Sequence, residues 1–230
     1  FAYRHRVTTA DLACHQNYGL APQRVAVTGA SGLIGTALTA FLRSGGHQVT
    51  RLARSTSSDQ DVISTVAGQW PDEVLGASDT VVHLAGENLA AGRWTNARKQ
   101  RIRESRVAGT RQLAEQLAQL EHPPRTLICA SAIGIYGHRG LTPADESSPE
   151  GEDFLAKVCQ EWEAAAQPAR DASIRVLHLR FGIVLTPAGG ALAQMLSPFR
   201  LGIGGVMGGL DSGCSRPGRP KVRFGSRCSM

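Results

Sequence analysis

A glycine-rich turn near the amino end constrains this chain more than any other feature. Residues 24–35 are RVAVTGASGLIG, in which a short apolar run leads directly into three glycines at a three-residue spacing. A helical pattern begins immediately after them. A buried strand, a tight glycine turn and a helix start, in this order, form the place where a parallel α/β sheet holds a dinucleotide pyrophosphate.

Glycine is needed at each of these three positions for a different physical reason. Gly29 permits a sharp turn, because glycine enters the positive-φ region freely. Gly32 has no side chain, so a phosphate can approach the backbone, and Gly35 lets the helix pack closely on the strand. The free N–H groups and the dipole at the helix start favour an anion there. The alternative interpretation is a glycine-rich strand-to-helix connection that binds no ligand.

The rest of the chain alternates between strand and helix patterns, which predicts an α/β fold: a doubly wound parallel sheet of Rossmann type. Apolar residues at helical spacing predict helices over 33–44, 96–120 and 152–166. Buried strands are predicted at 47–54, 79–86, 125–132 and 174–180. The strand at 79–86 ends in small residues, which would let a ligand lie across its carboxyl end.

Composition divides the chain into three parts. Residues 1–21 have no clear hydrophobic period and are interpreted as a leader or the remnant of a preceding domain. Residues 22–209 are predicted to form an NAD(P)-binding Rossmann-like domain. Residues 210–230 are rich in Gly, Ser, Arg and Pro, and we expect a disordered basic tail, because such a segment cannot bury enough apolar surface to offset its ordering entropy.

The net charge of +6 is concentrated at the two ends of the chain, which leaves about +1 for residues 21–209. That is too little for a face that follows nucleic-acid phosphates, so we expect no nucleic-acid partner. No run approaches the ~18 apolar residues of a membrane span, and we expect no membrane partner. The five scattered cysteines lack metal-ligand or redox spacing, so we assign no metal site and expect a reducing cytoplasm.

The end of the second strand separates NAD from NADP. An NAD site places Asp or Glu there to accept a hydrogen bond from the ribose 2′-hydroxyl. Here Arg54 ends the strand and no acid is present. An acid would repel a 2′-phosphate, whereas arginine pairs with it in a forked geometry. We therefore predict NADP (NADPH) rather than NAD, with a solvated loop arginine as the alternative.

Several sequence runs together resemble those of the extended short-chain dehydrogenase/reductases, in particular the epimerase-like branch known as NAD-dependent epimerase/dehydratases. The runs span roughly residues 22–209 and are TGASGLIG (28–35), HLAGENL (83–89), SAIGIYG (131–137), GEDFLAKVCQEWE (151–163), LRFGIVL (179–185) and GGALAQMLSPFRLGIGG (189–205). In combination they are far more specific than any one of them alone.

The resemblance implies a set of cofactor contacts. The pyrophosphate would be held by Gly29, Ser31, Gly32, Leu33 and Ile34. The adenosine and its ribose would lie over Leu84, Ala85 and Gly86, with Arg54 on the 2′-phosphate. Arg106 would reach a cofactor phosphate or ribose, and Val184 would touch the nicotinamide end.

One departure from the family concerns catalysis. Extended reductases use a Tyr-x-x-x-Lys pair, in which the lysine lowers the pKa of the tyrosine so that it exchanges a proton near neutral pH. Here Asp153 occupies the tyrosine position and Lys157 follows it. Ser131 matches the usual serine, which would hydrogen-bond a substrate carbonyl. Tyr136 is a nearby hydroxyl for the role of acid; its alternative is a packed loop anchor.

A second departure follows residue 205, where the family continues into a helical substrate lobe. This chain has the basic tail instead, so we expect the lobe to be largely missing. The sequence predicts an NADP-dependent oxidoreductase or epimerase acting on a small hydroxyl or carbonyl substrate. The alternatives are a catalytically weak NADP-binding regulator or scaffold, similar to family members described as cell-division inhibitor homologues, and a truncated product with no stable fold. The oligomeric state stays open.

Overall fold

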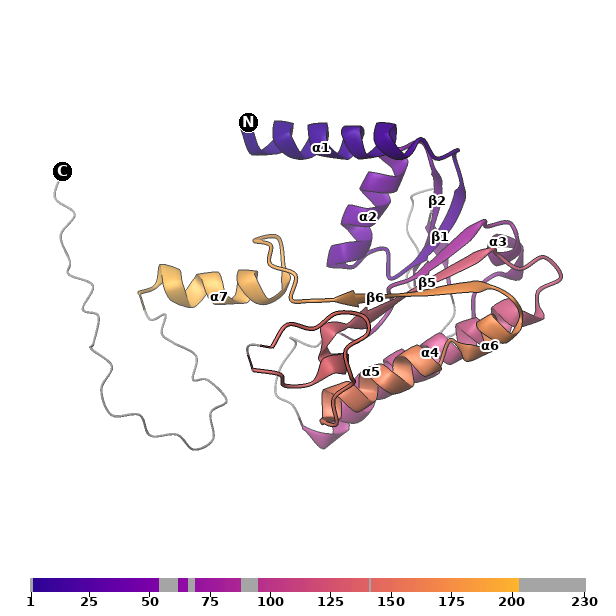
Figure 1. Ribbon diagram of the computed structural model, residues 1–230. Helices are drawn as coiled ribbons and strands as arrows, with labels where there is room; N and C mark the ends of the chain where they lie inside the picture. The colour runs from indigo at the N-terminus through magenta and orange to yellow at the C-terminus, as the bar shows by residue number, and fades with distance from the viewer. Residues whose placement is uncertain (1, 54–61, 66–68, 88–94, 141, 203–230) are drawn as a thin grey trace.

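The computed structural model describes residues 2–53, 62–65, 69–87, 95–140 and 142–202 (Figure 1). Parallel strands form one six-stranded sheet in the order β3-β2-β1-β4-β5-β6. The strands are β1 (Arg24–Thr28), β2 (Gln48–Ala53), β3 (Val62–Ser64), β4 (Thr80–His83), β5 (Thr126–Ala132) and β6 (Arg175–Phe181). The predicted doubly wound parallel sheet is confirmed.

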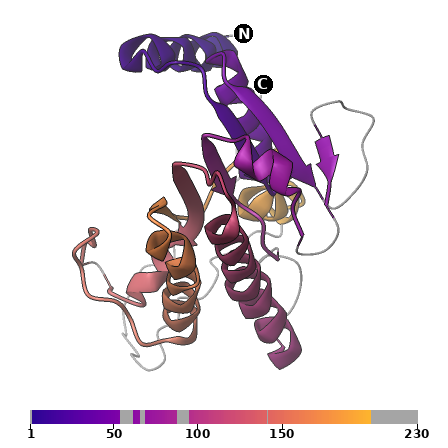
Figure 2. The same ribbon diagram turned by 90° about the vertical axis from the view of Figure 1, so that its right-hand side faces the viewer.

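Eight helices, counted over the described residues, accompany the sheet and flank both of its faces. They are α1 (Ala2–Tyr18), α2 (Leu33–Ser44), α3 (Asp72–Gly76), α4 (Asn96–Gln119), α5 (Phe154–Ala164), α6 (Gln167–Asp171), α7 (Gly190–Arg200) and the 3-10 helix η1 (Ile133–Tyr136). The helices α1 and α2 lie on one side of the sheet, and α4, α5 and α6 lie on the other (Figure 1 and Figure 2).

Alternate strand residues build a core on each face, which is the usual pattern of a parallel sheet buried on both sides. Val81 and Leu127 pack with Leu113 of α4, and none of the three exposes any measurable surface. On the other face Val27 packs with Leu38 of α2. No helix in the described part of the chain is long and apolar enough to cross a membrane.

The amino-terminal segment forms a helix that the sequence did not indicate. Helix α1 docks through one end only: the His15 ring stacks on Phe41 with centroids 4.3 Å apart, and His15 Nε2 lies 3.1 Å from Ser44 Oγ. Tyr3 and Tyr18 are more than two-thirds exposed. Because so little of the helix is buried, it needs no apolar stripe, and its sequence therefore has no hydrophobic period that would predict a helix.

Short elements were also missed. Residues 55–78 had no predicted structure, yet β3 and α3 lie in their described part, and α6 follows α5. Elements of three to five residues are too short to show a hydrophobic period. The expected disorder of residues 210–230 lies outside the described residues.

The strand order places a crevice between β1 and β4. The chain runs outward from β1 through β2 to β3, and then returns to β4 on the other side of β1. Ligands of doubly wound sheets bind at such a switch point, at the carboxyl ends of the strands. Strand β1 ends at Thr28, directly before the glycine turn, and β4 ends at its register partner His83.

Candidate functional site

The glycine turn packs directly against the segment that follows β4. Gly29 has a φ of 68°, and a Cβ atom there would lie 2.7 Å from the backbone of Leu84 and Ala85. A Cβ on Gly35 would overlap the carbonyl oxygen of Gly29, whereas a Cβ on Gly32 would meet only that oxygen, at 3.2 Å. The positive φ predicted for Gly29 is therefore confirmed, and Gly35 packs closely on the turn itself, at Gly29 and Ala30.

Helix α2 begins at this turn without a side-chain cap. Its N-cap residue is Gly32, which makes no side-chain hydrogen bond. The first N–H groups of an α-helix have no partner within the helix, and they carry the positive end of its dipole. This backbone therefore offers hydrogen-bond donors and partial positive charge to an anion.

A cleft of about 430 Å³ opens beside the turn. Its described lining comes from the carboxyl ends of β1, β2 and β4, from the residues that follow β3 and β4, and from α4. The lining residues are Thr28, Gly29, Ser31, Gly32, Leu52, Ala53, Thr65, Trp70, His83, Leu84, Ala85, Gly86, Glu87, Ser105 and Gly109. Six of the residues predicted for cofactor binding are brought together there: Gly29, Ser31, Gly32, Leu84, Ala85 and Gly86.

Other predicted cofactor residues lie beside this lining. Leu33, Ile34 and Gly35 form the first turn of α2. A Cβ added to Gly190, at the start of α7, would lie 3.5 Å from Leu33 Cδ2 and 3.6 Å from the carbonyl oxygen of Val184. The segment after β6 therefore reaches the start of α2. Arg54 lies outside the described residues, so its contact with a 2′-phosphate stays a prediction.

Arg106 binds the backbone of the segment after β4. It donates to the carbonyl oxygens of Glu87 (3.0 Å) and Ile102 (3.2 Å), and its guanidinium lies 5.1 Å from the Trp162 ring centroid. Burial lowers the pKa of Arg106 from its ordinary value. The predicted contact between Arg106 and the cofactor stays a prediction; in the structure this side chain holds Glu87 in place.

His83, which the sequence analysis did not single out, lies in the floor of the cleft. It is 1% exposed, and its Nδ1 lies 2.7 Å from Thr28 Oγ1. Burial lowers its pKa to about 4, so the ring is neutral near pH 7. The Trp70 ring meets it edge-on, with centroids 6.1 Å apart. The residues Thr28 and His83 are far apart in sequence, and only the pairing of β1 with β4 joins them.

A second cluster lies at the carboxyl ends of β5 and β6. Ser131, which is 2% exposed, donates from Oγ to Glu163 Oε1 at 2.6 Å. Arg180 binds both oxygens of Glu163, each at 2.9 Å. A further Arg180 nitrogen donates to the Tyr136 hydroxyl at 2.8 Å. We call these four residues the Ser–Glu–Arg–Tyr network.

The charges of this network stabilise each other. Burial acts to raise the pKa of Glu163, but the hydrogen bonds from Arg180 and Ser131 outweigh it, and the net pKa is lowered. The hydrogen bond to Glu163 raises the pKa of Arg180. The pair is therefore ionised across the neutral range, with side chains only 14% and 23% exposed. Glu163 and Arg180 lie within sequence runs quoted above, but nothing local marked them.

The predicted roles of Ser131 and Tyr136 stay predictions. The Ser131 proton is donated to Glu163, so Ser131 would have to release that carboxylate before donating to a substrate oxygen. Asp153, in place of the missing tyrosine, caps helix α5: its carboxylate accepts from the backbone N–H of Ala156 at 2.9 Å. Aspartate is a favoured residue at that position. The cap therefore accounts for Asp153 without a role in catalysis.

Two of the cysteines are core residues, as the apolar pattern around them predicted. Cys129 is 0% exposed and Cys159 is 5% exposed. Burial raises the pKa of Cys129 to about 12 and that of Cys159 to about 11. Both thiols are therefore protonated near neutral pH, and neither is a ready nucleophile.

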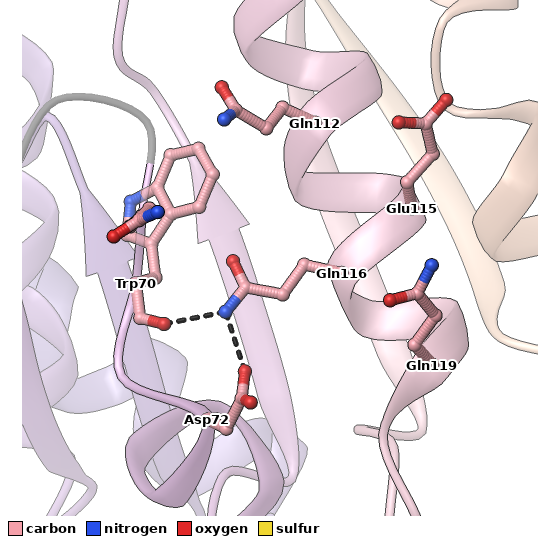
Figure 3. Close-up of a pocket in the computed structure, with 7 residues that line it drawn as sticks. Trp70, Asp72, Gln112, Glu115, Gln116 and Gln119 are labelled. Atoms are coloured by element: carbon pink, nitrogen blue, oxygen red, sulfur yellow. Dashed lines mark hydrogen bonds between the residues drawn. The ribbon is translucent and has the colours of Figure 1, made fainter.

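Another hollow, of about 480 Å³, lies between Trp70 and the outer face of α4 (Figure 3). It is lined mainly by amide and carboxylate side chains. The Gln116 amide donates to the Trp70 carbonyl oxygen at 2.5 Å and to Asp72 Oδ1 at 2.6 Å, so part of this polar surface is already satisfied. The described residues that line this hollow include no glycine, and the cleft at the glycine turn is the stronger candidate site.

The residues of the cleft fit a dinucleotide. The backbone is open at Gly32, the helix start is uncapped, and Ala85 and Gly86 leave room over the end of β4. A phosphate needs close backbone approach and free N–H groups, and both are present. The aromatic and aliphatic side chains of Trp70 and Leu52 in the same cleft suit a flat heterocycle.

Comparison with known sequences gives one family over most of the chain. The sequence pattern of the NAD dependent epimerase/dehydratase family matches residues 25–200. Epimerase family protein MT2273 of Mycobacterium tuberculosis is 40% identical over 186 residues, which are 80% of this chain and 61% of that protein. Human epimerase family protein SDR39U1 is 36% identical over 188 residues, covering 80% and 62%. The chain spans less than two thirds of the length of these curated relatives.

Solved structures agree with the sequence comparison. The nucleoside-diphosphate sugar epimerase from Corynebacterium glutamicum superposes with a TM-score of 0.75 at 40% identity, over 86% of this chain and 43% of that one. Human epimerase family protein SDR39U1 (isoform 2), solved with NADPH, gives a TM-score of 0.67 at 35% identity, over 79% and 61%.

Proposed function

Because the chain belongs to the NAD dependent epimerase/dehydratase family, we propose that it is an NADP-dependent oxidoreductase or epimerase acting on a small hydroxyl or carbonyl substrate. The cleft between the ends of β1 and β4 carries this proposal. A backbone cradle at a switch point of a parallel sheet is suited to a dinucleotide cofactor.

Two observations support NADP over NAD. Arg54 ends the second predicted strand, where an NAD site would have an acid. The structure of the human relative contains NADPH. Together they favour a cofactor with a 2′-phosphate, whose charge the guanidinium would match.

In this proposal the two halves of the carboxyl edge have separate tasks. The N–H groups at Leu33 and Ile34 would hold the pyrophosphate, and Gly32, whose own N–H donates to the Gly29 carbonyl at 3.0 Å, would let it approach the backbone. Leu84–Gly86 would support the adenosine. When bound, the nicotinamide cofactor supplies the hydride chemistry. Tyr136 gives a proton to the substrate oxygen as its carbonyl becomes an alcohol, or takes it in the reverse direction. Ser131 is assigned to the same reaction, either on the substrate oxygen or through Glu163.

Thermal unfolding with NADPH, with NADH and with no ligand tests the cofactor proposal. A ligand that binds only the folded state stabilises it by RT ln(1 + [L]/Kd), about 2.7 kcal/mol at a hundredfold excess over Kd. We expect NADPH to raise the melting temperature clearly and NADH to raise it less. Equal melting in all three samples would contradict the proposal.

A second candidate function is a catalytically weak NADP-binding regulator or scaffold. The observation that favours it is Asp153, which caps α5 where a reductase would carry its tyrosine. Tight NADPH binding without oxidation by any of a panel of aldehydes and ketones would support this candidate over the first.

The proposal extends to location and partners. The cysteines among the described residues, Cys14, Cys129 and Cys159, are free thiols, which suits a cytoplasmic protein. The expected partner is a small-molecule substrate bound beside the nicotinamide end, where the residues after β6 reach α2.

A further inference from the structure

We infer that Glu163 and Arg180 position Tyr136 as the proton donor of the proposed reaction, and that Ser131 acts by holding Glu163 rather than by touching the substrate. This inference rests on the proposed oxidoreductase function. It assigns two residues that the sequence resemblance gave no role, and it offers a replacement for the missing tyrosine of the Tyr-x-x-x-Lys pair.

The hydrogen bond between Arg180 and Tyr136 has a fixed direction. A guanidinium has only donors, so Arg180 must donate to the Tyr136 oxygen, which accepts at 2.8 Å. The phenolic proton is therefore not used within this contact and can be donated elsewhere. An acid that must deliver its proton needs this arrangement. A tyrosine that served only as a loop anchor would be expected to donate its hydroxyl proton in a hydrogen bond to a carbonyl oxygen of the protein.

The guanidinium itself is fixed by the carboxylate. Glu163 accepts from Nε and from a terminal nitrogen of Arg180, so the planar fork is held in one orientation. Glu163 is fixed in turn by the hydroxyl of Ser131 at 2.6 Å. Ser131 and Arg180 are register partners at the carboxyl ends of β5 and β6, so the strand pairing sets the distance across which Glu163 must bridge.

The backbone of Tyr136 is held as firmly as its side chain. Gly137, with a φ of 63°, and Gly151 meet at the neck of the loop between η1 and α5. A Cβ on Gly151 would come within 2.6 Å of the Gly137 Cα, and the Gly151 N–H donates to the Ile135 carbonyl at 2.8 Å. The tyrosine is therefore placed at the carboxyl edge of the sheet by contacts on both sides.

The proton and electron balance of the step is simple. In the reductive direction the reduced nicotinamide delivers a hydride to the carbonyl carbon, and the C=O π pair moves to oxygen. The Tyr136 O–H bond breaks, and its proton goes to that oxygen to give the alcohol. The phenolate that remains keeps its hydrogen bond from Arg180 and recovers a proton from water.

Steady-state reduction of 4-nitrobenzaldehyde by NADPH, within a panel of aromatic and aliphatic aldehydes and ketones, tests the inference. We expect Arg180→Met and Tyr136→Phe to lower kcat about a hundredfold, the typical contribution of a positioned acid, with KM and NADPH affinity unchanged. Guanidinium ion added to Arg180→Gly should restore part of the lost kcat. Arg103→Met is the matched control, because it removes an exposed Arg–Glu pair between α4 and α5 and should leave kcat unchanged.

The outcomes separate the inference from the proposed function. Normal kcat in folded Arg180→Met, with Tyr136→Phe impaired, would overturn the positioning role alone. Normal kcat in Tyr136→Phe would overturn the donor role. If Arg180→Met has a lowered melting temperature, kcat is measured in Arg180→Lys instead. A lysine keeps the charge but cannot bind Glu163 and Tyr136 in the same geometry, so kcat should fall in this variant too. No turnover by the unaltered chain with any carbonyl, despite NADPH binding, would overturn the proposed reaction and this inference with it.

Discussion

The two halves of the carboxyl edge are built from different parts of the chain. Beside β1 and β4 the site is made by backbone: a glycine at positive φ, an uncapped helix start and small residues. Beside β5 and β6 it is made by side chains, in the Ser–Glu–Arg–Tyr network. A pyrophosphate can be bound by backbone N–H groups alone, whereas the proton transfer that we propose needs specific side chains.

The two halves also differ in how they are covered. Val27 and Val82 of the central strands are at most 4% exposed. On β6, at the edge of the sheet, Leu177 and Leu179 are 36% and 42% exposed on the face away from Glu163. The sheet beside β1 and β4 is therefore buried on both faces, whereas β6, in the half that holds the Ser–Glu–Arg–Tyr network, is covered on one face only.

The largest expected effect comes from breaking the backbone-built half. Gly29→Ala should reduce the free energy of unfolding by about 4 kcal/mol, because the new Cβ overlaps the segment after β4 and occupies a positive-φ position. Gly46→Ala is the matched control: its φ is 83° but nothing lies within 4 Å, so about 1 kcal/mol is expected. Urea unfolding measures the free energy of unfolding of both variants. Equal losses would show that the close approach of Gly29 to Leu84 and Ala85 makes no contribution to the effect.

The next effect concerns the neutral histidine beneath the cleft. His83 has a pKa of about 4 in the folded state and an ordinary value of 6.5 when unfolded. Between these values the unfolded chain binds a proton that the folded chain does not, so stability falls as the pH falls. The loss attributable to His83 between pH 7 and pH 4 should be about 3 kcal/mol.

Urea unfolding of the unaltered chain and of His83→Gln at several pH values checks this prediction. The variant should be less stable at pH 7, because its side chain must repack against Thr28 and Trp70, but its stability should vary less with pH. Parallel curves for the two proteins would mean that His83 is not held neutral by burial.

The smallest effect is expected in the side-chain-built half. Ser131→Ala should cost about 2 kcal/mol, since it removes one hydrogen bond to a partly buried carboxylate and leaves Arg180 to hold it. Ser147→Ala, which removes an exposed serine–carboxylate bond to Asp145, should change stability by less than about 0.5 kcal/mol. A loss for Ser131→Ala as small as that of the control would mean that Glu163 does not depend on the serine.

The sequence predicted the backbone-built half because its signals are local. The spacing of Gly29, Gly32 and Gly35 lies within one strand–turn–helix unit, and the helix predicted over 33–44 has the bounds of α2. The strands β1, β2, β4, β5 and β6 were also recognised from their apolar runs, to within a few residues at each end.

The network and the shorter elements could not be predicted in this way. Glu163 and Arg180 meet only because β5 pairs with β6 in one register and α5 packs on β5. His83 likewise meets Thr28 only across paired strands. Such contacts depend on tertiary pairing, and no spacing along the chain encodes them. Helix α1 was not predicted for a different reason: it buries so little apolar surface that its sequence has no hydrophobic period.

Competitive calorimetric titration tests whether the cleft between β1 and β4 holds the adenosine half of NADPH. The probe is adenosine 2′,5′-bisphosphate, which carries the base, the ribose and the 2′-phosphate but no nicotinamide. We expect it to bind one-to-one and to displace NADPH from the same site. NADPH binding that a saturating concentration of the bisphosphate leaves unchanged would contradict it.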